Sequence, residues 1–309
     1  IIVELIKLAS LIITINKALA CAERVSCVLD IQSSMQYPED ITASGISRNN
    51  NTQNIVEFKN VSFLYKGAGA PILSDINFHV QKGQTVGIIG GTGSGKSSLV
   101  SLIPRFYDVN QGSVLLDGHD VRDYTQKELC DKVGIVQQKS ILFQGSIREN
   151  LQWGNENASD SDLWEALTLA QAKEIVEGKP GELDFMLKQN GQNLSGGQKQ
   201  RLSIARTLVK KPEVLILDDS SSALDFATDA ALRKAIRSLN GHTTTFLVSQ
   251  RIAGIRQADL ILVLDNGQLV GQGSHDDLMK TCEVYREIYF SQFPEERKKQ
   301  AQVQAGGEA

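Results

Sequence analysis

The sequence has few of the features that mark several well-known protein classes. Its 309 residues include only four cysteines, Cys21, Cys27, Cys130 and Cys282, and no CxxC pair. This pattern argues against a disulfide framework or a zinc site and favours a reducing compartment. Lys and Arg number 32 against 36 Asp and Glu, so the basic surface typical of nucleic-acid-binding proteins is absent. No uncharged apolar run reaches about 18 residues, which excludes a polytopic membrane protein.

The N-terminal residues 1–32 differ in composition from the rest of the chain. They are strongly apolar, and small or apolar residues recur at helical spacing between positions 8 and 29. The segment is therefore predicted to be helical, with two interpretations open. It is either an amphipathic surface helix or the cytoplasmic end of a transmembrane helix that continues upstream. A secretory signal is excluded because no basic start and small-residue cleavage site frame the segment.

Two polar segments frame the remainder of the chain. Residues 33–54 contain three consecutive asparagines, Asn49 to Asn51, and are interpreted as a linker. Residues 291–309 form a polar tail that is expected to fray. The intervening residues 55–290 are therefore expected to form one globular domain.

Short apolar runs alternate with helical patterns through this domain. Continuous apolar strands that alternate with helices indicate a buried parallel sheet and an α/β fold. Two early runs, 55–58 and 61–65, predict a strand pair in an attached antiparallel sheet, and Asp265-Asn266-Gly267 predicts a hairpin. The other predicted strands are 85–89, 114–116, 134–136, 214–217, 244–248 and 260–264, and the predicted helices are 96–106, 161–176, 197–209 and 227–239.

A glycine-rich segment carries the strongest chemical signal. Residues 90–97 read GGTGSGKS and fit G-x-x-x-x-G-K-[ST], between an apolar strand pattern and a helical one. Small residues let backbone N–H groups turn toward phosphate oxygens, and the helix N-terminus adds a favourable partial charge. Lys96 is expected to reach the outer phosphates and the Ser97 hydroxyl to hold Mg²⁺. The predicted phosphate-binding residues are Gly90, Gly91, Thr92, Gly93, Ser94, Gly95, Lys96, Ser97 and Ser98.

An aspartate at the end of an apolar run predicts the other side of the metal site. Residues 214–217 are all apolar, and Asp218 follows them directly. A buried strand that delivers a carboxylate at its C-terminal end suits a Mg²⁺ ion held beside phosphates.

Residues 194–201 read LSGGQKQR, and with the phosphate loop and Asp218 they closely resemble the cassette of ATP-binding cassette (ABC) transporters. In these residues, Ser195, Gly196, Gly197 and Gln198 lie at the start of a predicted helix, where a hydroxyl and N–H donors can meet an anion. The resemblance covers residues 55 to about 285. It implies a P-loop NTPase of the α/β class, with a RecA-like parallel-sheet core, an antiparallel β subdomain and a helical subdomain, preceded by a helix.

The resemblance also implies ligands, a partner and further site residues. Tyr65 resembles the aromatic residue that stacks on adenine, although a core tyrosine at a strand end is the alternative. Gln138 resembles the glutamine that contacts Mg²⁺, and residues 222–225 (SALD) resemble the loop that crosses the dimer interface. In this family two cassettes face head to tail, so that each ATP lies between one phosphate loop and the partner's LSGGQ. ATP, Mg²⁺ and a second cassette are therefore implied.

Two further segments resemble exporter cassettes in particular. They are residues 143–151, FQGSIRENL, and residues 271–278, GQGSHDDL. In exporters the last transmembrane helix runs through a short linker into the cassette, which favours the transmembrane interpretation of residues 1–32. The resemblance thus implies attachment to a transmembrane domain at the cytoplasmic face of a membrane and no nucleic-acid partner.

Two residues depart from the family pattern where γ-phosphate chemistry takes place. The family generally has Glu after the position of Asp218, but this chain has Asp219. Asp is shorter by about 1.5 Å, and a misplacement of about 1 Å can lower a rate on the order of 100-fold. The histidine expected after the strand at 244–248 is replaced by Gln250, which can hydrogen-bond a phosphate but cannot carry a positive charge.

These departures lead to one main prediction and leave alternatives open. The main prediction is an ATP-driven exporter subunit that hydrolyses ATP slowly at its own degenerate site. Its intact LSGGQ would complete the active site of a different partner chain, as in heterodimeric bacterial exporters of the multidrug type. If both substitutions are tolerated, a fully active homodimeric exporter is the alternative. Two further alternatives are a soluble ABC ATPase that acts on DNA or ribosomes and a non-catalytic ATP-binding module.

Overall fold

The computed structural model of this protein describes residues 1–31, 33, 35–38, 52–220, 223–239 and 241–296. The chain divides into two compact units, Ile1–Gln36 and Tyr37–Ala309. Much of the predicted linker, Ser222 of the SALD segment and the end of the predicted tail lie outside the described residues.

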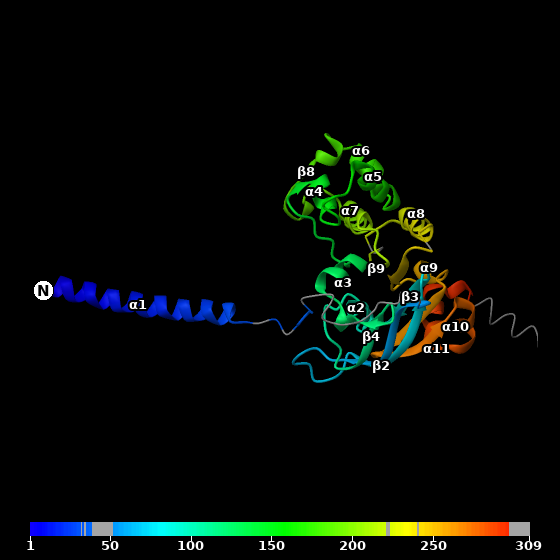
Figure 1. Ribbon diagram of the computed structural model, residues 1–309, viewed down its shortest axis with the longest axis horizontal. Coiled ribbons are helices and arrows are strands. Elements are labelled where there is room, and N and C mark those ends of the chain that lie inside the picture. The colour runs from blue at the N-terminus through cyan, green and yellow to red at the C-terminus, as the bar shows by residue number, and fades with distance from the viewer. Residues whose placement is uncertain (32, 34, 39–51, 221–222, 240, 297–309) are drawn as a thin grey trace, which may run out of the picture. The chain divides into compact units, whose positions relative to one another are not determined.

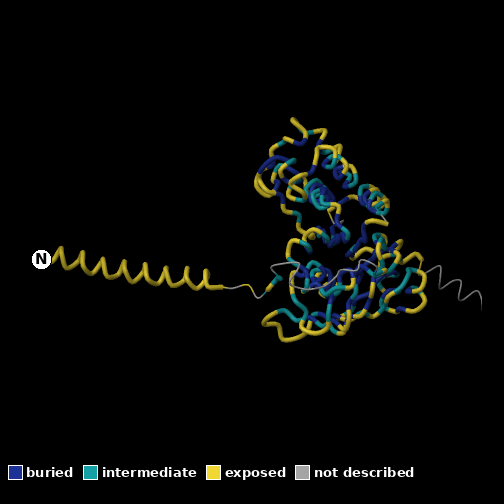
Figure 2. Tube along the Cα trace, viewed as in Figure 1, coloured by how far each residue is buried: buried dark blue, intermediate teal, exposed yellow. Residues whose placement is uncertain are grey.

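The first unit consists mainly of helix α1, Ile2–Leu29 (Figure 1). The predicted helix is therefore present. No residue of α1 is buried (Figure 2), so its apolar side chains pack against nothing within this unit. By length and composition the helix could cross a membrane, with a mean hydropathy of 1.7 over its most apolar window. Apolar side chains exposed in this way are normally covered by lipid or by another protein.

A six-stranded sheet lies at the centre of the second unit. The strands β11, β3, β10, β9 and β6 are parallel neighbours, and β12 pairs with β11 in a hairpin, as predicted. Every residue of β3 and β9 is buried, which is typical of parallel strands covered on both faces. The bounds are β3 (Thr85–Gly90), β6 (Val133–Val136), β9 (Val214–Asp218), β10 (Thr244–Val248), β11 (Leu260–Asp265) and β12 (Gln268–Gly273).

A second sheet is antiparallel, as expected, but its strands differ from the prediction. Its order is β2-β1-β4-β5, with bounds β1 (Asn54–Phe63), β2 (Leu73–Gln81), β4 (Gln111–Leu116) and β5 (His119–Asp120). The run 55–58 and residues 61–63 of the run 61–65, predicted as a strand pair, belong to the single strand β1, which is irregular at Asn60 with φ 50°. Strand β1 pairs with β4 on one side and with β2 on the other, and in β2 the buried residues Leu73, Ile76, Phe78 and Val80 are separated by more exposed ones.

The helices fall into two groups. Figure 1 shows α4 (Ile147–Gln152), α5 (Asp160–Leu169), α6 (Lys173–Glu177) and α7 (Gly196–Val209) grouped together with β8 (Met186–Leu187), which pairs with β7 (Gly145–Ser146). Of these helices, α7 also contacts β6 of the six-stranded sheet. One helix was predicted over 161–176, but the chain breaks between α5 and α6 at Gln171, where φ is 56°. The other helices are α2 (Lys96–Ser101), α3 (Gln126–Lys132), α8 (Phe226–Arg237), α9 (Ile252–Ile255), α10 (His275–Thr281) and α11 (Glu283–Gln292).

The α/β prediction is confirmed, and the topology positions the functional residues. Strands β3, β10 and β9 are adjacent and parallel, so their C-terminal ends lie at one edge of the sheet. The glycine-rich segment follows β3, Asp218 ends β9, and Gln250 follows β10. Ligands in open α/β sheets bind at this edge, beyond the carboxyl ends of the strands.

Candidate functional site

The glycine-rich segment forms a tight turn between β3 and α2, and two of its glycines have no room for a side chain. A Cβ atom on Gly90 would lie 2.1 Å from the carbonyl oxygen of Leu264, and φ at Gly90 is +157°. A Cβ atom on Gly95 would lie 2.7 Å from a methyl group of Leu73, and φ there is +95°. Only glycine adopts such conformations readily, so these positions bring the backbone close to its neighbours.

Lys96 lies inside this turn. Its Nζ atom donates hydrogen bonds to the carbonyl oxygens of Gly90 at 2.9 Å and Gly91 at 2.6 Å. Burial lowers the pKa of Lys96, while the charges of Asp218 and Asp219 oppose that shift. The ammonium group is thus held where it can meet an anion bound in the turn.

Asp218 and Ser97 meet at the end of β9. The Ser97 hydroxyl donates a hydrogen bond of 3.1 Å to Asp218 Oδ1. Burial raises the pKa of Asp218, while the hydrogen bond from Ser97 acts in the opposite direction. A hydroxyl and a carboxylate are hard oxygen donors of the kind that Mg²⁺ takes in phosphate sites.

The donor set fits a cation that is shared with a bound phosphate. Among the residues that the structure describes, no group of three or more His, Cys, Asp or Glu is arranged to hold a metal ion. Mg²⁺ commonly binds through one or two carboxylates together with water and substrate phosphates. Ser97, Asp218 and Gln138 line the same cavity and would be the protein ligands of such an ion.

Asp219 occupies an unusual backbone position beside this pair. Its φ is 45°, in the left-handed region, and its amide donates to the carbonyl oxygen of Val248 at 3.0 Å. Gln138 Nε2 donates to Asp219 Oδ2 at 3.2 Å. Burial raises the pKa of Asp219, while the charges of Lys96 and Arg251 oppose that shift. Two residues assigned to separate roles from the sequence are thus in direct contact.

Tyr65 approaches the same site from the antiparallel sheet. Its hydroxyl lies 2.9 Å from the Ser98 hydroxyl on α2, and its ring meets the ring of Phe63 edge-on at 4.7 Å. The ring is partly exposed and is not part of the buried core. This placement leaves it available for a planar ligand, as the resemblance implies.

A cavity of about 400 Å³ brings most of the predicted residues together. Gly90, Gly91 and Ser94 belong to the turn but do not line the cavity, and Ser94 is buried. Ile72, Val248 and Ser249 line it without having been predicted. The last two could have been found because Val248 ends β10 and Ser249 follows it, at the same sheet edge. The predicted residues that line it are Tyr65, Thr92, Gly93, Gly95, Lys96, Ser97, Ser98, Gln138, Asp218, Asp219 and Gln250.

The LSGGQ residues lie elsewhere in the second unit. Ser195 and Gln198 form a capping box at the start of α7: the Gln198 amide donates to Ser195 Oγ, and the Ser195 amide donates to Gln198 Oε1. Ser195 and Gly196 are exposed, and a Cβ atom on Gly197 would lie 3.0 Å from the carbonyl oxygen of Ala223. None of these residues lines the cavity. Within one chain, therefore, the two motifs do not form a common site.

The chain is similar to known proteins of the ABC transporter family. Residues 73–222 match the family model described as ABC transporter. The chain is 40% identical over 281 residues to an uncharacterized ABC transporter ATP-binding protein of Mycobacterium tuberculosis, covering 89% of this chain and 47% of that protein. It is 41% identical over 237 residues to a putative multidrug export ATP-binding/permease protein of Staphylococcus aureus, and the match covers 77% of this chain and 41% of that protein.

A solved structure is also similar. A bacterial Atm1-family ABC exporter with ATP bound matches with a TM-score of 0.80 and 34% identity, over 90% of this chain and 48% of that one. This likeness establishes the fold as the P-loop cassette predicted from the motifs. The chain spans about half the length of the relatives that it matches.

Proposed function

We propose that this chain, which carries the ATP-binding cassette of an exporter-type ABC transporter, binds Mg²⁺-ATP and couples the nucleotide to export across a membrane. The observation that carries the proposal is the cavity in which residues from separate segments meet at one sheet edge. Tyr65 would stack on the base, and Lys96 would meet the outer phosphates. Ser97, Gln138 and Asp218 would hold Mg²⁺, which supplies positive charge to the phosphates.

An exporter is favoured over a soluble ATPase by two observations. Helix α1 exposes apolar side chains along its whole length and is long enough to cross a membrane. The Staphylococcus aureus relative is named as a combined export ATP-binding and permease protein, and this chain covers 41% of it. A membrane domain would therefore precede the cassette, with α1 as its last segment and the cassette at the cytoplasmic face.

We further propose that the chain's own site hydrolyses ATP slowly. A general base must reach the attacking water. The side chain of Asp219 is one methylene shorter than that of Glu, and its carboxylate accepts a hydrogen bond from Gln138. Gln250 lines the cavity as a neutral amide, so no positive charge from an imidazole reaches the γ-phosphate there. Both features lower the rate of the chemical step without removing the contacts that bind ATP.

The position of LSGGQ supports a two-chain active site. Ser195 and Gly196 are exposed at the N-terminus of α7, outside this chain's own cavity. A second cassette that brings a Glu and a His to its own phosphate loop would be completed by these residues. The proposed assembly is therefore an asymmetric pair with one weak and one competent site.

Turnover measurements test the weak site. The full chain and its Asp219→Glu/Gln250→His variant are compared for ATP hydrolysis, with ATP affinity measured for both. We expect the native chain to bind ATP but turn it over slowly, and the double variant to be at least about tenfold faster, consistent with restored base geometry. A native rate typical of an ordinary ATPase would refute the degenerate site and favour the homodimeric exporter. No ATP binding at all would refute the proposed function itself.

A mixing experiment tests the shared site. Gly196 has open space around it, so Gly196→Asp places a carboxylate at the motif without a clash. One copy carries Asp219→Glu, Gln250→His and Gly196→Asp, and the other copy is native. We expect each copy alone to be slow and the mixture to be fast, because the native Ser195 region completes the competent site. A mixture as slow as its parts would contradict the shared arrangement.

A further inference from the structure

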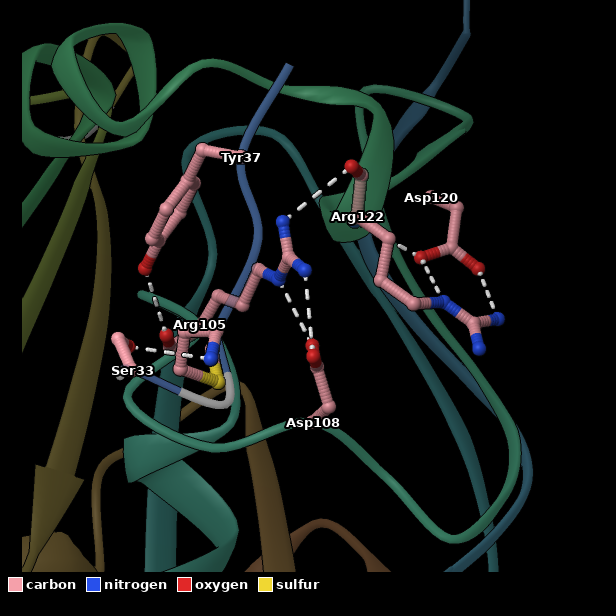
Figure 3. A network of polar contacts seen from close by, with 7 residues as sticks. Ser33, Tyr37, Arg105, Asp108, Asp120 and Arg122 are labelled. Atoms are coloured by element: carbon pink, nitrogen blue, oxygen red, sulfur yellow. Dashed lines mark hydrogen bonds and ion pairs between the residues drawn. The ribbon is translucent and has the colours of Figure 1, made fainter. Parts of the chain in front are cut away.

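The first residue of the second unit, Tyr37, is attached to the turn that follows α2. Its hydroxyl donates to the carbonyl oxygen of Arg105 at 3.1 Å, and the Arg105 guanidinium lies 4.6 Å from the centre of its ring (Figure 3). The two residues are separated by 68 positions in sequence. Tyr37, which precedes the first strand, therefore contacts both the backbone carbonyl and the guanidinium of Arg105.

Arg105 itself is held from several sides. It is 4% exposed, and its φ is 54°. Its guanidinium donates to both carboxylate oxygens of Asp108, at 2.7 and 3.2 Å, and to the carbonyl oxygen of Arg122 at 3.3 Å. Arg122 forms its own two-point pair with Asp120 (Figure 3). Such paired contacts fix the plane of a guanidinium, so the turn after α2 is held in one conformation.

The same turn carries a ring to the predicted base-binding residue. Tyr107 meets Tyr65 edge-on, with ring centres 5.1 Å apart at 87°, and lies 5.5 Å from Phe63. The Tyr65 hydroxyl meets Ser98. Tyr65 is thus held by a ring on each of two sides and by a hydroxyl at its tip. Tyr107 does not line the cavity, so its contact is with Tyr65 and not with the ligand.

We propose that Tyr107 is a positioning residue for the nucleotide base and that Tyr37 fixes the turn that carries it. The inference rests on the proposed function, in which Tyr65 stacks on adenine. Edge-to-face aromatic pairs favour one relative orientation of the rings, and a ring already held in its bound position loses less freedom when a ligand arrives. The segment before the cassette thereby acts on base affinity through Tyr37, Arg105 and Tyr107.

The test compares two ligands that share phosphates but differ in the base. Affinities of the full chain for Mg²⁺-ATP and for Mg²⁺-tripolyphosphate are measured by calorimetry for native protein, Tyr107→Ala and Tyr107→Phe. We expect Tyr107→Ala to weaken ATP binding by about three- to tenfold, the scale of one aromatic pair and one ordered side chain. Tripolyphosphate affinity is expected to stay constant, and Tyr107→Phe to retain native ATP affinity because it keeps the ring.

A second pair of variants tests the contact between Tyr37 and Arg105. Tyr37→Ala removes the ring and the hydroxyl, whereas Tyr37→Phe keeps the ring over Arg105. We expect Tyr37→Ala to weaken ATP binding about twofold to fivefold, Tyr37→Phe to lie between it and native protein, and neither to change tripolyphosphate affinity. Both Tyr37 variants leave every cavity residue in place, and the two Phe variants keep an aromatic ring where the Ala variants remove it.

The outcomes separate this inference from the proposed function. If native protein binds ATP and the Ala variants bind it equally well, the inference is wrong and the proposed function stands. Equal losses for ATP and tripolyphosphate would also overturn it, because a general distortion of the site would then explain the effect. If native protein binds tripolyphosphate as tightly as ATP, the base adds no affinity. The proposed stacking on Tyr65 is then wrong, and the inference is wrong with it.

Discussion

Ser97 and Asp218 are joined by a hydrogen bond of 3.1 Å between Oγ and Oδ1, although 121 residues separate them in sequence. The contact exists because β3 and β9 both flank β10 in parallel, so that helix α2, which follows β3, brings Ser97 to the last residue of β9. Two motifs recognised separately in the sequence thus form one oxygen-donor pair. Because both atoms are hard donors, this pair defines where a Mg²⁺ ion would bind.

Removal of the Ser97 hydroxyl is expected to affect only the metal-dependent part of nucleotide binding. Ser97→Ala should weaken ATP affinity about tenfold in the presence of Mg²⁺, consistent with the loss of one hydrogen bond or ligand at a charged site. Affinity for ATP in EDTA should change little. The measurement is ATP titration under the two conditions, and a loss of equal size in both would contradict the assignment.

Removal of the Lys96 ammonium is expected to be more severe. Its Nζ contacts the carbonyl oxygens of Gly90 and Gly91 and is the buried cation of the turn. Lys96→Ala should weaken ATP binding at least about 100-fold, because it removes the one cationic side chain among the described residues that line the cavity. Lys280→Ala, which removes an exposed lysine on α10, is the matched control and should bind as native protein does. Native-like binding by Lys96→Ala would show that phosphates are bound elsewhere.

The phosphate turn and Asp218 were predictable because their geometry is local. Glycine at positions 90 and 95 indicates a backbone with no room for a Cβ atom, and an apolar run that ends in Asp indicates the edge of a buried sheet. The contact between Gln138 and Asp219 was not predictable in the same way. The contact depends on how the side chains of two separate segments meet and on a left-handed backbone at Asp219. That backbone conformation cannot be predicted from the residue type.

The antiparallel sheet shows the limit of pattern reading more clearly. The interruption between residues 58 and 61 suggested two strands, yet one strand continues through Asn60 in a left-handed conformation. Asn tolerates that conformation better than most residues, so a strand can bend there without ending. Strand β2, one of the two partners of β1, was not among the predicted strands. It alternates buried and more exposed residues but also contains Asp75 and Asn77, residue types that are uncommon in strands.

A buried carboxylate that joins the two sheets offers a test of stability. Asp117 is 4% exposed, and it pairs with Lys82 at 2.8 Å and with Lys132 at 3.0 Å, which in turn pairs with Glu213. Asp117→Asn should lower the free energy of unfolding by about 1–3 kcal/mol, since both lysines are partly exposed and can regain water. Denaturant unfolding measures this, with exposed Asp131→Asn as the control.

The same carboxylate predicts a dependence on pH. Burial acts to raise the pKa of Asp117, but the hydrogen bonds and charges of Lys82 and Lys132 outweigh it, and the pKa is lowered. A lowered pKa contributes stability above the unfolded value of about 3.9, and that contribution is lost as the pH falls toward the folded value. The difference in unfolding free energy between native protein and Asp117→Asn should therefore shrink below about pH 4. A difference that is constant down to pH 2 would contradict the ion-pair explanation.

The last prediction uses two adjacent glycines of the phosphate turn as test and control. A Cβ atom at Gly90 would lie 2.1 Å from the Leu264 carbonyl oxygen and 2.6 Å from Ser94 Oγ, whereas one at Gly91 would meet nothing within 4 Å. Gly90→Ala should therefore lower the free energy of unfolding by about 2–4 kcal/mol, through backbone strain and displacement of β11. Gly91→Ala should unfold within about 0.5 kcal/mol of native protein. Urea denaturation of the pair measures this, and equal stabilities would show that the turn is not pressed against β11.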